Sequence, residues 1–131
     1  MGDMETKIIR NPEKPTMQKI VKYYGQIAKA MDILHTSNLI HCGIKPSNIS
    51  LDEHMSPMLG EPSKVEIDYA RDNQQMFSKM LIAEAMPKIL IYWAPELLRG
   101  EKYNEKIDIW SFGITCFEVF NSLDLHWPAS I

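Results

Sequence analysis

The sequence predicts an α+β fold that is mainly α-helical and contains one short β-hairpin. Two long apolar patterns, over residues 16–37 and 107–120, indicate helices, and two short β-prone runs between them flank a polar turn. At 131 residues, 45% hydrophobic and 24% charged, the chain is large enough for one globular domain or part of one.

The domain is predicted to begin after Pro15. Residues 1–15 are polar and charged, and Pro12 and Pro15 disfavour a long helix, so this part is expected to be a lead-in segment. Residues 16–131 contain every pattern described below and are expected to form the domain itself.

The first helix is predicted from the spacing of its apolar residues. These residues recur at steps of three and four from Met17 to Leu34, with lysines and other polar residues on the opposite face. Thr16 is the expected N-cap, and the helix should end near Ser37. The pattern is typical of a packing helix, and the hairpin, with strands over 49–51 and 57–59, should follow a polar loop.

Charge and composition exclude several classes of partner. The net charge of -3 and the lack of any run of Lys and Arg argue against nucleic acid and against an anionic membrane surface. No apolar stretch reaches the roughly 18 residues that a membrane span requires. Cys42 and Cys116 could form a disulfide, but the N-terminus lacks the apolar core of a signal peptide, so a reduced cytoplasmic location is predicted.

The loop after the first helix resembles the catalytic loop of protein kinases, in which His-Arg-Asp is followed, after a spacer, by Asn. His41, Lys45 and Asn48 match this pattern, whereas Cys42 and Gly43 replace the Arg and the Asp. In the family the Asp accepts the proton of the substrate hydroxyl, which a glycine cannot do. The resemblance therefore implies a degenerate catalytic loop without its base.

The same resemblance implies ligands for the retained residues. Asn48 would bind magnesium, and Lys45 and Asn48 would contact a nucleotide, with ATP and Mg²⁺ expected only if the site is retained. The alternative is that Lys45 and Asn48 only satisfy backbone groups of the loop.

A second metal ligand is expected after the hairpin, where kinases carry Asp-Phe-Gly. The interval from Asn48 places Glu61-Pro62-Ser63 there, so Glu61 would keep a carboxylate and Pro62 would replace the aromatic residue. Asp68-Tyr69-Ala70 is a competing placement. However, the apolar residues before it do not fall on the alternate positions expected for the strand that precedes this motif in the family.

Two later segments extend the resemblance. Tyr92-Trp-Ala-Pro-Glu96 is similar to the Ala-Pro-Glu end of the activation segment, whose earlier part, from Met76 to Met86, has an amphipathic pattern. Asp108-x-Trp-Ser-x-Gly is similar to the start of the central kinase helix, which implies that Asp108 caps the backbone around His41. Helices that follow in the family would cover one side of this apolar helix and would supply an Arg partner for Glu96.

The resemblance runs from about Thr16 to Leu123 and implies the larger, C-terminal lobe of a protein kinase. The Gly-rich loop and the nucleotide-binding lysine strand of the smaller lobe are not found in the sequence. The favoured hypothesis is an inactive pseudokinase that serves as a protein-interaction module, with an active kinase or a separate small lobe as partner. The alternatives are an active Ser/Thr kinase and a truncated relic without a stable fold.

Overall fold

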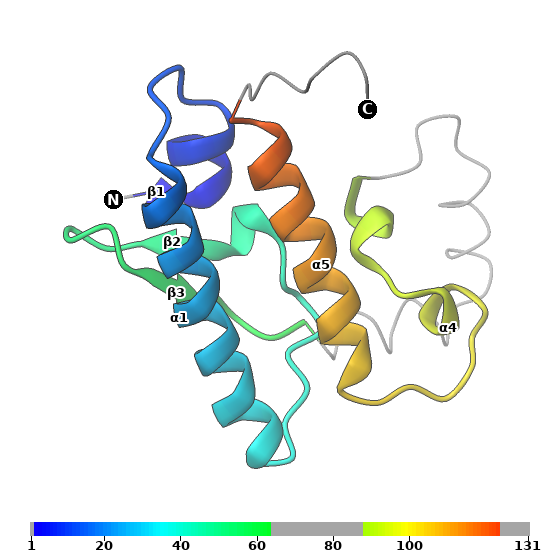
Figure 1. The fold of residues 1–131 in the computed structure, drawn as a ribbon. Helices are drawn as coiled ribbons and strands as arrows, with labels where there is room; N and C mark the ends of the chain where they lie inside the picture. Colours follow the sequence, from blue (N-terminus) through cyan, green and yellow to red (C-terminus); the bar gives the residue numbers. More distant parts are fainter. Residues whose placement is uncertain (1, 64–87, 124–131) are drawn as a thin grey trace, which may run out of the picture.

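A computed structural model of the chain describes residues 2–63 and 88–123, and all structural statements refer to these residues. Their fold is mainly helical with a small antiparallel sheet, as predicted (Figure 1). In chain order the elements are the strand β1 (Gly2–Asp3), the π-helical turn η1 (Glu5–Ile9), the helix α1 (Met17–Thr36), the 3-10 turn η2 (Pro46–Asn48), the strands β2 (Ile49–Leu51) and β3 (Pro57–Leu59), the 3-10 turn η3 (Lys88–Tyr92), and the helices α4 (Pro95–Leu98) and α5 (Lys106–Asn121).

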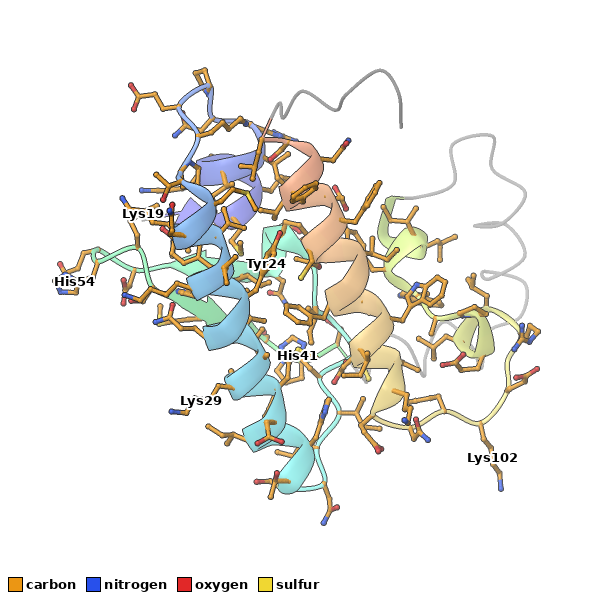
Figure 2. The ribbon with its side chains drawn as sticks, in the orientation of Figure 1. Lys19, Tyr24, Lys29, His41, His54 and Lys102 are labelled. Carbon is orange, nitrogen blue, oxygen red and sulfur yellow. The ribbon has the colours of Figure 1, made fainter. Side chains whose placement is uncertain are left out.

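Helix α1 forms where the apolar spacing predicts it. The side chain of Thr16 accepts a hydrogen bond from the Lys19 amide at 3.3 Å, which confirms the predicted N-cap. Tyr24 points from α1 towards α5, whereas Lys19 and Lys29 point away from the body of the protein (Figure 2). The Tyr24 hydroxyl donates to the Cys116 carbonyl at 2.8 Å, so a specific polar contact joins the two long helices.

The predicted hairpin is present as β2 and β3, which pair antiparallel with Ile49 opposite Leu59. Ile49 and Leu51 are buried and Ser50 between them is exposed, because successive strand residues face opposite sides of a sheet. The Asp52 side chain closes the turn by accepting two backbone N–H groups.

The N-terminal residues contribute more to the fold than their polar composition indicates. β1 adds a third strand beside β2, with Gly2 opposite Leu51. Met4 and Ile8 are completely buried within the larger apolar cluster. The expectation of a lead-in segment rested on composition, which does not show that two apolar side chains in a polar segment face a hairpin distant in sequence.

Two apolar clusters form the core. The larger one contains the buried face of α1, the sheet and Val119 of α5, and the smaller one contains Cys42, Leu97 and Ile107. Helix α5 therefore contributes to both clusters, and Figure 1 shows it lying between α1 and α4. None of the described helices is long and apolar enough to cross a membrane.

One face of α5 is left exposed by the described residues. Ile109, Trp110 and Phe117 are 57%, 43% and 66% exposed, as expected for a helix whose apolar residues lie on all sides but are covered here on one side only. Glu96 lines a surface groove on this face beside Trp110, and no ion pair of Glu96 is found among the described residues.

Replacing Ile8 by alanine should lower the free energy of unfolding by about 2–5 kcal/mol, because it removes a completely buried side chain from a packed cluster. The matched control is Ile33→Ala on α1, where the same side chain is 60% exposed and the expected change is within about 0.5 kcal/mol. Urea denaturation of both variants measures the difference. If both variants lost the same free energy of unfolding, residues 2–9 would not belong to the cooperative core.

Candidate functional site

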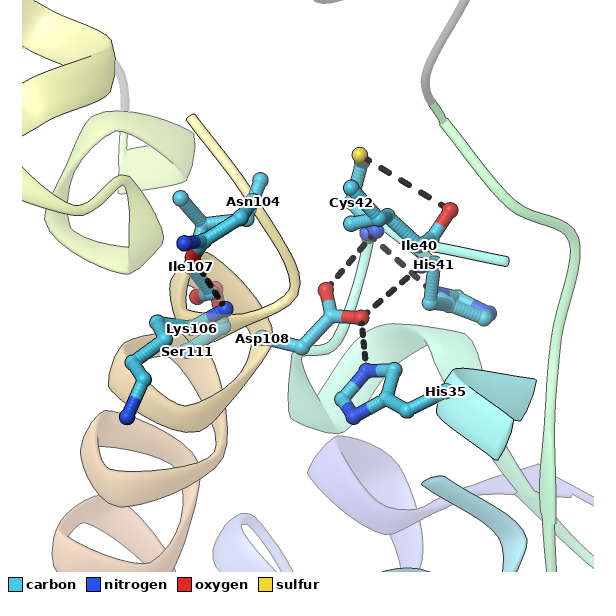
Figure 3. A network of polar contacts seen from close by, with 10 residues as sticks. His35, Ile40, His41, Cys42, Asn104, Lys106, Ile107, Asp108 and Ser111 are labelled. Carbon is cyan, nitrogen blue, oxygen red and sulfur yellow. Dashed lines mark hydrogen bonds and ion pairs between the residues drawn. The ribbon is translucent and has the colours of Figure 1, made fainter. Parts of the chain in front are cut away.

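The buried carboxylate of Asp108, in the first turn of α5, organises the candidate site (Figure 3). Its two oxygens accept hydrogen bonds from the backbone amides of His41 and Cys42 at 2.8 and 2.9 Å. The His35 Nε2 atom lies 2.8 Å from the Asp108 Oδ2 atom, and it donates because a carboxylate oxygen only accepts. Asp108 therefore caps the loop backbone, as the sequence predicts, and three donors satisfy its buried oxygens.

Cys42 occupies a conformation that non-glycine residues seldom adopt, with a φ of 67°. Such a backbone costs about 1–3 kcal/mol and persists where surrounding bonds fix it, and the bond from the Cys42 amide to Asp108 does so here. The side chain is buried in the smaller apolar cluster beside Leu90 and Ile107. Cys42 and Cys116 are not joined in a disulfide. Position 42 therefore offers a buried apolar contact and no cation.

His41 is buried, and hydrogen bonds occupy both of its ring nitrogens. The Gly43 amide donates to Nδ1 at 3.1 Å, and Nε2 lies 2.8 Å from the Gly60 carbonyl. Since a carbonyl only accepts, Nε2 carries the hydrogen and Nδ1 is the acceptor. The imidazole therefore joins the loop to the end of the hairpin and has no nitrogen free for a ligand.

Further hydrogen bonds join the loop to residues 60–63, which follow β3. The Gly60 amide donates to the Asn48 carbonyl at 2.7 Å, and the Ser63 amide donates to the His41 carbonyl at 2.9 Å. The Asn48 side-chain nitrogen donates to the carbonyls of Gly43 and Glu61 at 2.9 and 3.0 Å. The two segments thus form a closed polar seam.

The predicted metal ligands, Asn48 and Glu61, lie on the two sides of this seam. Both hydrogens of the Asn48 amide are used within the protein, and a Cβ at position 60 would lie 2.8 Å from the Asn48 Cγ atom, so the amide packs directly on Gly60. Glu61 is exposed, and its backbone carbonyl contacts Asn48. Neither bond uses the Asn48 Oδ1 atom, the oxygen that would bind a divalent ion, and this atom lies against Gly60. A metal role for both residues stays a prediction.

Lys45 precedes η2 in an extended conformation and is half-buried. Its carbonyl accepts the Asn48 amide at 2.9 Å. Within residues 2–63 and 88–123, the Lys45 side chain makes no hydrogen bond or ion pair, and no three His, Cys, Asp or Glu side chains gather around a possible metal position. Contact between Lys45 and a nucleotide therefore also stays a prediction.

The segment that resembles the end of the activation segment is fixed to α5. The Ser111 hydroxyl donates to the Tyr92 carbonyl at 2.5 Å, and the Tyr92 hydroxyl donates to the Glu118 carboxylate. Burial, together with this hydrogen bond and the negative charge of Glu118, raises the pKa of Tyr92. Pro95 begins α4, where a proline is well tolerated because the first helical amides have no helical partner.

Two residues of the site were not singled out from the sequence. His35 lies in the last turn of α1, and only the fold brings it to Asp108. Ser63 lies beside Gly43, and the resemblance placed it in the Asp-Phe-Gly position without showing that contact. The competing placement, Asp68-Tyr69-Ala70, and the predicted helical piece from Met76 to Met86 lie outside the described residues.

The fold and the loop geometry define a kinase-like domain, and comparison with known proteins supports this class. Residues 1–129 match the family model for the protein tyrosine and serine/threonine kinase domain. The chain belongs to the protein kinase family.

The chain is similar to protein kinases from a plant, a yeast and human. The protein kinase and PP2C-like domain-containing protein of Arabidopsis thaliana is 29% identical over 93% of the chain. The serine/threonine-protein kinase ATG1 of Komagataella pastoris is 35% identical over 76% of the chain, and the human dual specificity tyrosine-phosphorylation-regulated kinase 3 is 31% identical over 84%. The matches span 20%, 13% and 17% of these relatives' own lengths.

Replacing Asp108 by asparagine should lower the free energy of unfolding by about 1–3 kcal/mol, because an amide supplies one oxygen for three donors and leaves at least one buried donor without an acceptor. The control is Asp52→Asn in the hairpin turn, where a single oxygen accepts both N–H groups and an amide can replace it. Its expected change is below about 0.5 kcal/mol. Chemical denaturation compares the two, and a neutral Asp108→Asn would contradict its capping role.

Proposed function

We propose that this chain is a catalytically inactive protein-kinase-like domain that acts as a protein-interaction module in the cytoplasm. The observation that carries the proposal is Gly43 at the position of the family's catalytic base, in a loop whose amides at His41, Cys42 and Gly43 are all bonded within the protein. Without a side chain at position 43, nothing there accepts the proton of a substrate hydroxyl.

The neighbouring side chains do not replace this base. Both nitrogens of His41 are engaged, one with the Gly43 amide and one with the Gly60 carbonyl. The Asp108 carboxylate is completely buried and holds three donors. Each group is used to hold the loop, which supports a structural role for the retained motif.

The exposed face of α5 supports the interaction role. Ile109, Trp110 and Phe117 present large apolar side chains to solvent, and clusters of this kind mark protein contacts more often than isolated apolar residues do. An active kinase or a separate small lobe is the partner that the family resemblance suggests.

A second candidate function is phosphoryl transfer from ATP to serine or threonine hydroxyls of proteins. It is favoured by relatives named as serine/threonine-protein kinases, such as ATG1 of Komagataella pastoris. This function would need a base from outside the loop, with the Asn48 Oδ1 atom and Glu61 as the ligands for magnesium.

The complete chain should incorporate no phosphate from radiolabelled ATP, either into itself or into a generic basic protein, and Gly43→Asp should remain inactive. A positioned base contributes about 10²–10⁴ in rate, but Cys42 and Pro62 still replace the family's Arg and aromatic residue in that variant. An active serine/threonine kinase under the same conditions sets the detection limit. Transfer by the native chain would refute the proposed inactivity.

The apolar face of α5 should bind a dye specific for apolar surface, and Phe117→Ser should weaken that binding because it removes the most exposed aromatic side chain of the face. Val21→Ser is the control, since Val21 is 60% exposed but lies on α1 and not on the apolar face of α5. Dye fluorescence and sedimentation, recorded for both variants, test the assignment. Equal effects would show that α5 presents no distinct interaction surface.

A further inference from the structure

The side chain of Ser63 occupies the space beside Gly43. A Cβ atom at position 43 would overlap the Ser63 Oγ atom and would lie 3.1 Å from the Ser63 Cβ atom. It would also lie 3.3 Å from the Asn48 side-chain nitrogen. Two saturated carbon atoms in ordinary van der Waals contact lie about 3.5–4.0 Å apart. Any side chain at position 43 therefore requires residue 63 to move.

The backbone does not explain the glycine. Gly100 is the glycine with a positive φ among the described residues, so the φ angle does not require glycine at position 43. The obstacle to a larger residue is therefore the neighbouring side chain and not the loop conformation.

Residue 63 has little freedom to withdraw, because its backbone belongs to the seam. The Ser63 amide donates to the His41 carbonyl at 2.9 Å, two residues before Gly43. The Glu61 carbonyl on the same segment accepts the Asn48 amide, which also bonds to the Gly43 carbonyl. The Ser63 hydroxyl can rotate, but its Cβ atom is held against the loop.

We infer that Gly43 and Ser63 form a steric interlock in which residue 63 determines whether position 43 can carry a side chain. The resemblance puts a carboxylate at position 43 and glycine at position 63, and this chain has the reverse arrangement, glycine and then serine. In this chain the side chain of the pair therefore lies on the segment after β3 and not in the loop. The inference deepens the proposed function and rests on it only in reading position 43 as the lost base.

A cycle of four proteins tests the interlock by thermal unfolding of the complete chain: native, Gly43→Ala, Ser63→Gly and the double variant. With Ser63 present, Gly43→Ala should lower Tm by about 3–8 °C because of overpacking. With Ser63→Gly, the same change should leave Tm unchanged or raise it by up to about 3 °C, because alanine restricts the unfolded chain more than glycine does.

Gly25→Ala is the matched control, since a Cβ atom there meets nothing within 4 Å on the surface of α1. It should raise Tm by about 3 °C with either residue at position 63. Should a variant unfold too early for a thermal scan, urea midpoints at low temperature give the same cycle.

A change of sign between the two backgrounds, seen for Gly43→Ala and not for Gly25→Ala, supports the interlock. Equal shifts in both backgrounds would overturn it and leave the proposed inactivity untouched. Phosphate transfer by the native chain would overturn the proposed inactivity without affecting the cycle, so the two ideas fail separately.

Discussion

The carboxylate of Asp108 is the interaction on which the rest of the site depends. One buried side chain receives two consecutive loop amides and a histidine from the end of α1, so the end of α1 and the loop after it meet the distant helix α5 at two oxygen atoms. A buried carboxylate is costly unless its oxygens are satisfied, and these donors offset that cost. The loop therefore keeps a defined shape, including the strained backbone of Cys42, whatever chemistry it performs.

Local sequence patterns accounted for the elements whose signals are local. The apolar spacing, the Thr16 cap and the alternation in the hairpin depend on neighbouring residues, and the capping role of Asp108 followed from the family motif. Burial of Met4 and Ile8 and the contact of Ser63 with Gly43 depend on which segments meet in three dimensions. No periodicity within residues 1–15 or 60–63 carries that information.

In this site, residues of the family motif hold the loop backbone in place. The matching residues His41 and Asn48 donate or accept hydrogen bonds that hold the loop against the hairpin, and these are the contacts that shape the seam. Such contacts are independent of any ligand. The presence of the matching residues therefore supports the fold of the loop. Catalytic activity depends on other residues, namely those that would react.

The division of the core into two clusters has a consequence for cooperativity. Within residues 2–63 and 88–123, two segments contribute buried residues to both clusters: α5 through Val119 and Ile107, and the loop through Ile44 and Cys42. The loop therefore lies on the boundary between the two clusters, so loss of packing in either cluster would remove contacts from a loop residue that the other cluster also helps to hold. A partner that clamps α5 would change amide protection in both clusters without touching the loop.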